Sequence, residues 1–180
     1  MQNLTSYKKT SNRPRFISFN VCANQLHVSI RNKLIKALTS LHEEFKAIGV
    51  DLVMEITEDE RLEKVEKVIE TLKIINRTGI KIAIDDYGRY FSSPSMVSFI
   101  EDLHILKVDK SFISSLEANC LISKSFIKHA LDIAEIKKCQ IIIEGIEKGS
   151  QIKLLGSTAN HSTIWYQGYF FSQPKPICEL

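Results

Sequence analysis

Polar residues recur at the ends of the apolar segments that the sequence predicts as strands. They are Asn20, Glu55, Asp85, Asp86, Lys107, Asp109, Glu144 and Gln167. Because the carboxyl ends of parallel strands meet at one rim of an α/β fold, we expect these side chains to converge there. Buried carboxylates side by side need a multivalent cation to offset their repulsion. Oxygen ligands from Asp, Glu and Asn suit Mg²⁺ or Mn²⁺ better than zinc, and two such ions with a lysine nearby are typical of phosphodiester hydrolysis.

Each of these residues also has a purely structural interpretation. The Asp-Asp pair at 85–86 can cap the turn that follows it, and Thr57 with Glu60 fits a helix-start signature. Lys107 can extend its ammonium group to solvent, and Gln167 can be a turn residue. The joint pattern favours a site, because one strand after another contributes a polar group to the same rim.

The polar residues depend on strands that the apolar pattern predicts in alternation with helices. Short runs rich in branched and aromatic residues predict strands at 16–22, 51–56, 80–85, 104–109, 140–146 and 165–170. Apolar residues at three- and four-residue steps predict helices at 30–48, 62–75, 95–102 and 149–156, with a longer helical region that ends at about Lys138. This order implies parallel strands joined by right-handed crossovers. A flavodoxin-like open sheet and part of a TIM barrel both fit it.

Length and composition bound the class of protein. The chain has 180 residues, of which 44% are hydrophobic and 25% charged. That predicts one globular domain, short of the ~250 residues usual for a closed (β/α)₈ barrel. The net charge of +3 is mild, and the basic residues near the start lack the density of a nucleic-acid arm. No apolar run approaches the ~18 residues of a membrane helix. The N-terminus lacks a signal-peptide core, and the widely spaced cysteines fit a reduced protein. We expect a cytoplasmic protein that binds neither DNA nor membranes.

At the polar positions the sequence resembles the EAL domain, the family of bacterial cyclic di-GMP phosphodiesterases. The matching segments are FNVCANQL (19–26), EITE (55–58), IDDYG (84–88), LKVDKSFI (106–113), IIEGIE (142–147) and YQGYFFSQPKP (166–176). The corresponding family motifs are V-N-L-S-x-x-Q-L, E-x-T-E, I-D-D-F-G, L-K-I-D-R-S-F-V, V-A-E-G-V-E and Q-G-Y-x-F-S-x-P-x-P. The resemblance implies an α/β fold, an incomplete TIM-type (β/α) barrel with about six mostly parallel strands.

The resemblance also implies which residues would hold metal ions. Asn20, Glu55 and Asp85 would ligate one Mg²⁺ or Mn²⁺ ion, and Asp85, Asp86 and Glu144 would serve the second. The implied reaction hydrolyses one phosphodiester of cyclic di-GMP and gives linear pGpG.

Other matching residues would act on the substrate and its surroundings. Lys107 would contact the attacking water, and Glu58 would steady the loop after the Asp pair. Gln167, Asp109 and Glu147 would belong to the substrate-binding environment.

The sequence departs from the family pattern in two places. It contains neither the Glu-Ala-Leu motif nor the Leu-x-Arg motif whose arginine holds the substrate phosphate. Loss of a metal ligand and a phosphate contact predicts a fall in rate of the order of 10²–10³-fold or more. The family loop D-D-F-G-T-G-Y-S-S reads D-D-Y-G-R-Y-F-S-S at 85–93, so Arg89 and Tyr90 replace a small pair. That difference puts the family's coupling of dimer contacts to metal binding in doubt.

We expect a polar tail at 1–15, a truncated EAL domain at 16–176 and a C-terminal tail at 177–180. Without the strands that come first in the family, the barrel cannot close and two sheet edges stay unpaired. We therefore expect a homodimer or a protein partner to cover the open edge. Two functions stay open: a cyclic di-GMP phosphodiesterase of impaired activity, or an inactive module that senses cyclic di-GMP or regulates through protein contacts. A fragment without a role is the third possibility.

Overall fold

The computed structural model describes residues 14–26, 28–57, 65–89, 94–156 and 164–176. Within these ranges the strands are β1 (Phe16–Cys22), β2 (Asp51–Thr57), β3 (Lys81–Tyr87), β4 (Ile105–Val108), β5 (Gln140–Ile143) and β6 (Ile164–Tyr166). The helices are η1 (Ala23–Leu26), α2 (Val28–Lys46), α3 (Val65–Arg77), α4 (Pro94–Phe99), α5 (Lys110–Glu117), α6 (Leu121–Lys137) and α7 (Gly149–Gly156). Strands and helices alternate as the sequence predicts.

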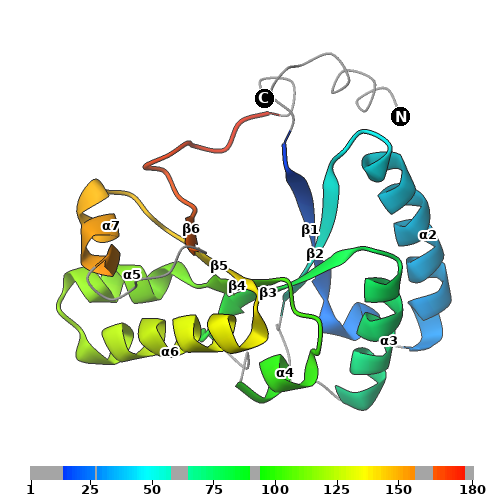
Figure 1. Ribbon diagram of the computed structural model, residues 1–180, viewed down its shortest axis with the longest axis horizontal. Coiled ribbons are helices and arrows are strands. Elements are labelled where there is room, and N and C mark those ends of the chain that lie inside the picture. The colour runs from blue at the N-terminus through cyan, green and yellow to red at the C-terminus, as the bar shows by residue number, and fades with distance from the viewer. Residues whose placement is uncertain (1–13, 27, 58–64, 90–93, 157–163, 177–180) are drawn as a thin grey trace.

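The strands form one sheet whose order is the order of the chain, from β1 to β6. All neighbouring pairs are parallel. The helices lie along the outer side of the curved sheet (Figure 1). β1 and β6 are the end strands, so the described chain forms an open, incomplete (β/α) barrel, which confirms the predicted fold class. The sequential order excludes the flavodoxin-like alternative, in which the chain order of the strands is interrupted.

The two faces of the sheet bury different residues. Outward-pointing side chains pack beneath the helices, as Leu52, Met54 and Ile56 of β2 do. The inner face carries a second, smaller apolar cluster of Val53, Ala83, Ile105 and Ile142, with Phe16 and Trp165 packed against it. Because side chains alternate along a strand, the next inward positions are Glu55, Asp85, Lys107 and Glu144. A polar rim therefore lies one step above an apolar layer.

One predicted helical region is two helices. The sequence pattern predicts a continuous region that ends at about Lys138, but α5 ends at Glu117 and α6 begins at Leu121. Asn119, between them, has a φ of 57°, which a helix cannot include. α6 does end where predicted, with Lys138 in the left-handed conformation.

Two strands end three or more residues before their predicted ends. The segment predicted at 140–146 ends as a strand at Ile143, just before Gly145, whose φ is 74°. The segment predicted at 165–170 ends at Tyr166. Gly168 follows, and its backbone lies so close to that of Ile146 that a Cβ would not fit. Both strands end where a glycine lets the chain turn.

Three of the cysteines are free thiols: Cys22, Cys120 and Cys139. Burial raises the pKa of Cys139 to about 11, so this thiol is an inert core residue. Cys178 lies outside the described residues. Among the helices that the structure describes, none combines the length and the apolar character needed to cross a bilayer.

Candidate functional site

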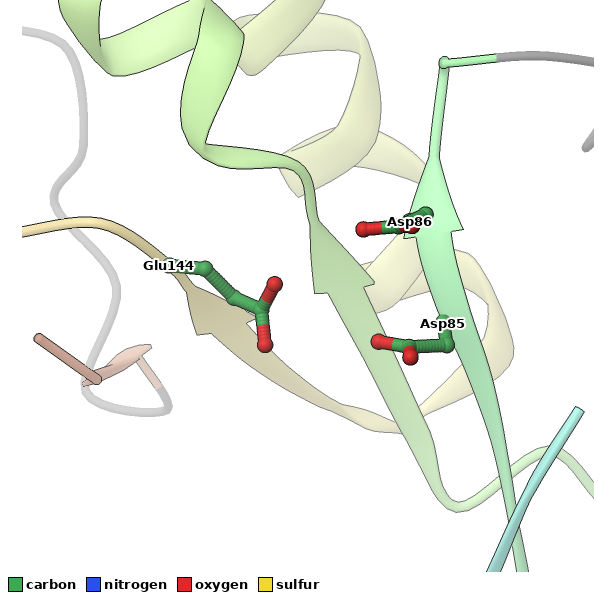
Figure 2. A group of neighbouring side chains, drawn as sticks. All are labelled: Asp85, Asp86 and Glu144. Carbon is green, nitrogen blue, oxygen red and sulfur yellow. The ribbon is translucent and has the colours of Figure 1, made fainter. Parts of the chain in front are cut away.

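Three carboxylates come together at the carboxyl ends of β3 and β5. One oxygen from each of Asp85, Asp86 and Glu144 lies within 4.8 Å of the others. In Figure 2 the two aspartates project from β3 toward Glu144, which follows the last residue of β5. All three residues are partly exposed, so an ion can reach them from solvent.

A bulge in β3 lets two consecutive aspartates share the site. In a regular strand, neighbouring side chains point to opposite faces of the sheet. The pairing of β3 with β4 shifts register between Ile84 and Tyr87, and Asp86 has a φ of 49°. Aspartate tolerates this left-handed region better than most residues. The bulge therefore turns Asp86 to the same side as Asp85.

Lys107 of β4 is the cation at the centre of the cluster. Its Nζ lies 2.7 Å from Glu55 Oε2, 2.8 Å from Asp85 Oδ1 and 2.8 Å from Glu144 Oε1. The residue is only 6% exposed. Burial alone would lower the pKa of Lys107, but the three carboxylates outweigh burial and raise it. Lys107 is therefore charged, and it ties β2, β3 and the end of β5 together across the inner face.

Negative charge is in excess at the rim. Burial raises the pKa of Glu144, even though Lys107 opposes the shift. Burial also raises the pKa of Asp86, and the neighbouring Asp85 and Asp109 add to the shift. A divalent cation would relieve this repulsion, and carboxylate oxygens are the ligands that Mg²⁺ and Mn²⁺ take. The residues present therefore fit a hard divalent cation, which Asp85, Asp86 and Glu144 can hold.

Asp109 and Arg89 border the cluster on the side of Asp86. Asp109 is 2% exposed, and its carboxylate caps α5 by accepting a hydrogen bond from the Ser111 backbone N–H at 2.9 Å. Burial would raise the pKa of Asp109, but its hydrogen bonds to Ser111 and Asp86 and the charge of Arg89 lower it overall. Arg89 Nη1 lies 3.6 Å from Asp86 Oδ2 and 3.6 Å from Asp109 Oδ2. The guanidinium group thus bridges two carboxylates.

The other predicted site residues lie around this cluster. Asn20 is exposed on β1, in register with Glu55 on β2. Gln167 is exposed just after β6, and Glu147 is exposed between β5 and α7. Glu58 lies outside the described residues. The roles of these residues, and a substrate contact by the buried Asp109, stay predictions.

Comparison with known proteins identifies the family. The family model described as the EAL domain matches residues 1–174 of the 180. The chain belongs to the EAL domain family. A relative from Escherichia coli K12, PdeG, named a probable cyclic di-GMP phosphodiesterase, is 32% identical over 143 residues. That match covers 78% of this chain and 27% of PdeG, so the chain spans about a quarter of the length of this curated relative.

Solved structures of EAL domains have the same fold. The EAL domain of Mycobacterium smegmatis DcpA superposes with a TM-score of 0.74 at 23% identity, over 90% of this chain and 69% of that one. Bacillus subtilis YkuI, described with an EAL domain in complex with substrate c-di-GMP and calcium, gives a TM-score of 0.74 at 22% identity, over 97% of this chain and 41% of that one. At these identities the likeness shows the fold alone.

Two features of this EAL domain escaped the sequence analysis. Arg89 is visible in the sequence only as a departure from the family loop, whereas the structure places it between Asp86 and Asp109. The sequence signal for such a turn is an arginine three residues after an aspartate, with a glycine between them. The second feature is Tyr87, whose hydroxyl is buried with no hydrogen-bond partner among the described residues. Nothing in the sequence signals that.

Proposed function

We propose that this EAL domain binds cyclic di-GMP together with Mg²⁺ or Mn²⁺ at the acidic rim, which consists of the carboxylates of Glu55, Asp85, Asp86, Asp109 and Glu144. There it hydrolyses one phosphodiester bond to give linear pGpG, at a reduced rate. The observation that carries the proposal is the meeting of Asp85, Asp86 and Glu144 within 4.8 Å, beside the buried Lys107. The family assignment supports it. So do the name of PdeG and the cyclic di-GMP and calcium with which YkuI is described.

The chain's own residues supply position and charge. Asp85, Asp86 and Glu144 would hold the cation, and Glu55 is linked to them through Lys107. When bound at such a site, a divalent cation lowers the pKa of a water molecule and offsets charge on phosphate oxygens. Lys107 keeps the carboxylates oriented and places a positive charge next to the reacting groups, where charge develops.

The remaining roles in the proposal rest on the family resemblance. Asn20, in register with Glu55, would add a ligand from β1. Glu58 would steady the loop that follows the Asp pair. Gln167 and Glu147 would line the dinucleotide, and Asp109 would contribute from the start of α5.

The reduced rate is supported by what the sequence does not contain. The 180 residues include neither Glu-Ala-Leu nor Leu-x-Arg, so a metal ligand and a phosphate contact of the family pattern are missing from them. Removing one group that stabilises a transition state costs about 10²–10³-fold in kcat. A binding module without turnover is therefore the second candidate.

Incubation with cyclic di-GMP and Mn²⁺, followed by chromatography, separates these candidates. We expect slow formation of pGpG, which Asp85→Asn abolishes because it removes a charged ligand and a contact of Lys107. Asp132→Asn is the matched control, since Asp132 is exposed on α6, away from the rim, and this variant should keep wild-type turnover. Absence of pGpG contradicts the enzyme. Calorimetric binding of cyclic di-GMP without product would then support the sensor, and no binding would support a module that acts through protein contacts.

We also propose that a second copy of the chain covers the open sheet edge. Within the residues that the structure describes, β1 and β6 end the sheet, so each has an unpaired edge there. Beyond β6 the side chains of Tyr169, Phe170 and Phe171 are 63%, 50% and 54% exposed. An unpaired edge beside exposed aromatic rings favours association. Sedimentation equilibrium should show a dimer, whereas a monomer with the melting temperature of an intact domain would contradict the proposal.

A further inference from the structure

Two side-chain cations of the chain are already bound to the acidic rim. The carboxylates there belong to Glu55, Asp85, Asp86, Asp109 and Glu144. Lys107 pairs with three of them at 2.7–2.8 Å, and Arg89 pairs with the other two at 3.6 Å. In the described chain, each carboxylate of the rim therefore contacts one of these two cations.

The turn after β3 fixes the position of Arg89. The Arg89 backbone N–H donates a hydrogen bond to the Asp86 carbonyl oxygen at 3.0 Å. Between them Gly88 has a φ of 95°, and a Cβ there would clash with the Phe126 ring. Tyr87 is fully buried and also packs on Phe126, with ring centroids 5.4 Å apart. The turn is thus held against α6, and Arg89 leaves it beside the rim.

The two cations engage the same carboxylates that can hold a metal ion. Among the three, Asp85 and Glu144 contact Lys107. The third, Asp86, contacts Arg89. A divalent cation bound to all three would bring two more positive charges within a few ångströms of both side chains, where like charges repel strongly.

We propose that Lys107 and Arg89 compete with a divalent cation for the carboxylate oxygens of Asp85, Asp86 and Glu144, so that the metal ion binds only as both side chains loosen their contacts with these oxygens while Lys107 stays beside the site. The inference rests on the metal site of the proposed function. It assigns Arg89 a role as a residue that sets metal affinity. Arg89 stands where the matching family motif has a small residue, so this EAL domain holds its metal ion less tightly than the carboxylates alone would.

Burial determines how strongly each cation competes. The Lys107 side chain is 8% exposed, and its contacts are at full hydrogen-bond distance. The Arg89 side chain is 44% exposed, so solvent weakens its pairing with Asp86. We therefore expect a gain in metal affinity of about fivefold on removing the charge of Arg89, and of at least about tenfold for Lys107.

Titration calorimetry of the full chain with Mn²⁺ alone tests the inference at a slightly alkaline pH. Arg89→Gln should bind Mn²⁺ about fivefold more tightly than wild type, and Arg89→Lys, which keeps the charge, should stay near wild type. Lys81→Gln is the matched control. It removes a cation that pairs with Asp51 at 2.6 Å, at the other end of β3. Salt screens the charge of Lys81 from a metal ion bound at the rim. Affinity of Arg89→Gln equal to or below wild type would overturn competition and make Arg89 a support for Asp86.

Lys107→Met provides a second readout, because the metal-free variant leaves three carboxylates without their cation. Circular dichroism should show a melting temperature well below wild type without Mn²⁺, and a larger rise on adding Mn²⁺ than wild type shows. A rise no larger than that of wild type contradicts the inference. If Lys107→Met does not fold in either condition, the Arg89→Gln comparison decides.

These measurements separate the inference from the proposed function. Mn²⁺ is the sole probe, so failure to hydrolyse cyclic di-GMP leaves the comparison intact. Equal binding by wild type and Arg89→Gln overturns the inference alone. No Mn²⁺ binding by any of the chains would overturn the metal site and the inference together.

Discussion

Asp86 and Tyr87 are adjacent in β3 but lie in opposite environments. The Asp86 side chain is 38% exposed at the rim. Tyr87 is 0% exposed and packs against Phe126 in the core between sheet and helices. Burial raises the pKa of Tyr87, and its hydroxyl has no hydrogen-bond partner among the described residues. The bulge that brings Asp86 to the site therefore also places a phenol where an apolar ring would suffice.

Replacing Tyr87 with Phe should stabilise the protein by about 1 kcal/mol, because it removes a buried hydroxyl whose desolvation nothing offsets. Urea denaturation monitored by circular dichroism measures the change in the free energy of unfolding. Tyr169→Phe is the control: Tyr169 is 63% exposed, and its change should stay within about 0.5 kcal/mol. A loss of stability in Tyr87→Phe would mean that the hydroxyl has a partner outside the described residues.

The sequence pattern predicts the strands and helices well where the burial of apolar residues determines them. Residues 52–56 of β2 and 141–143 of β5 are buried without a break between the helices and the inner face, which their largely apolar composition indicates. The bulge at Asp86 and the helix break at Asn119 could not be predicted, because both depend on a positive φ at a residue other than glycine. The hydrophobic periodicity of the sequence does not indicate a positive φ at such a residue. The packing of the surrounding residues imposes it.

The same limit applies to the candidate site. Six of its residues follow from the rule that polar groups at strand ends converge, and the structure brings them together: Glu55, Asp85, Asp86, Lys107, Asp109 and Glu144. The position of Arg89 does not follow, because it depends on Gly88 packing against rings from two other helices. Long-range packing of that kind has no local signature in the sequence.

His104 lies immediately before β4, and its protonation makes the stability of the fold depend on pH. Its Nδ1 accepts a hydrogen bond from the Ile82 backbone N–H at 3.3 Å, so the folded chain favours the neutral ring. Burial lowers the pKa of His104 and Lys81 adds to the effect, while Asp102 and Asp51 oppose it. A histidine whose pKa is lower folded than unfolded stabilises the fold above its unfolded pKa, and that stability is lost as pH falls through the folded value.

We therefore expect the free energy of unfolding of wild type, relative to His104→Gln, to fall as pH is lowered from about 6.5 through the lower pKa of the folded ring. Urea midpoints across this range measure the difference. The other titrating groups occur in both chains and cancel in it. If the difference in unfolding free energy between wild type and His104→Gln is constant with pH, or grows on acidification, the folded protein does not favour the neutral His104 ring.

Over the whole molecule, the acidic rim and an aromatic pair lie at opposite ends of the strands. Phe16 of β1 and Trp165 of β6 stack with ring centroids 5.9 Å apart, and the Arg15 guanidinium lies 5.3 Å from the Trp165 centroid. β1 and β6 are not hydrogen-bonded neighbours in the sheet. A cavity of about 140 Å³, lined in part by Lys81 and His104, opens beside these rings. Side chains therefore hold the two end strands of the open barrel toward each other.

The curvature of the open sheet can be tested through that pair. Phe16→Leu and Trp165→Leu should each lower the free energy of unfolding. Together they should lower it by less than the sum, with a coupling of about 1 kcal/mol, because each ring loses part of its value once the other is gone. Trp165 is the single tryptophan, so circular dichroism in urea is the common readout. Phe16→Leu combined with Phe112→Leu, in the other apolar cluster, should be additive. Coupling near zero for Phe16 and Trp165 would mean that the end strands move independently and that the sheet keeps its curve through the helices alone.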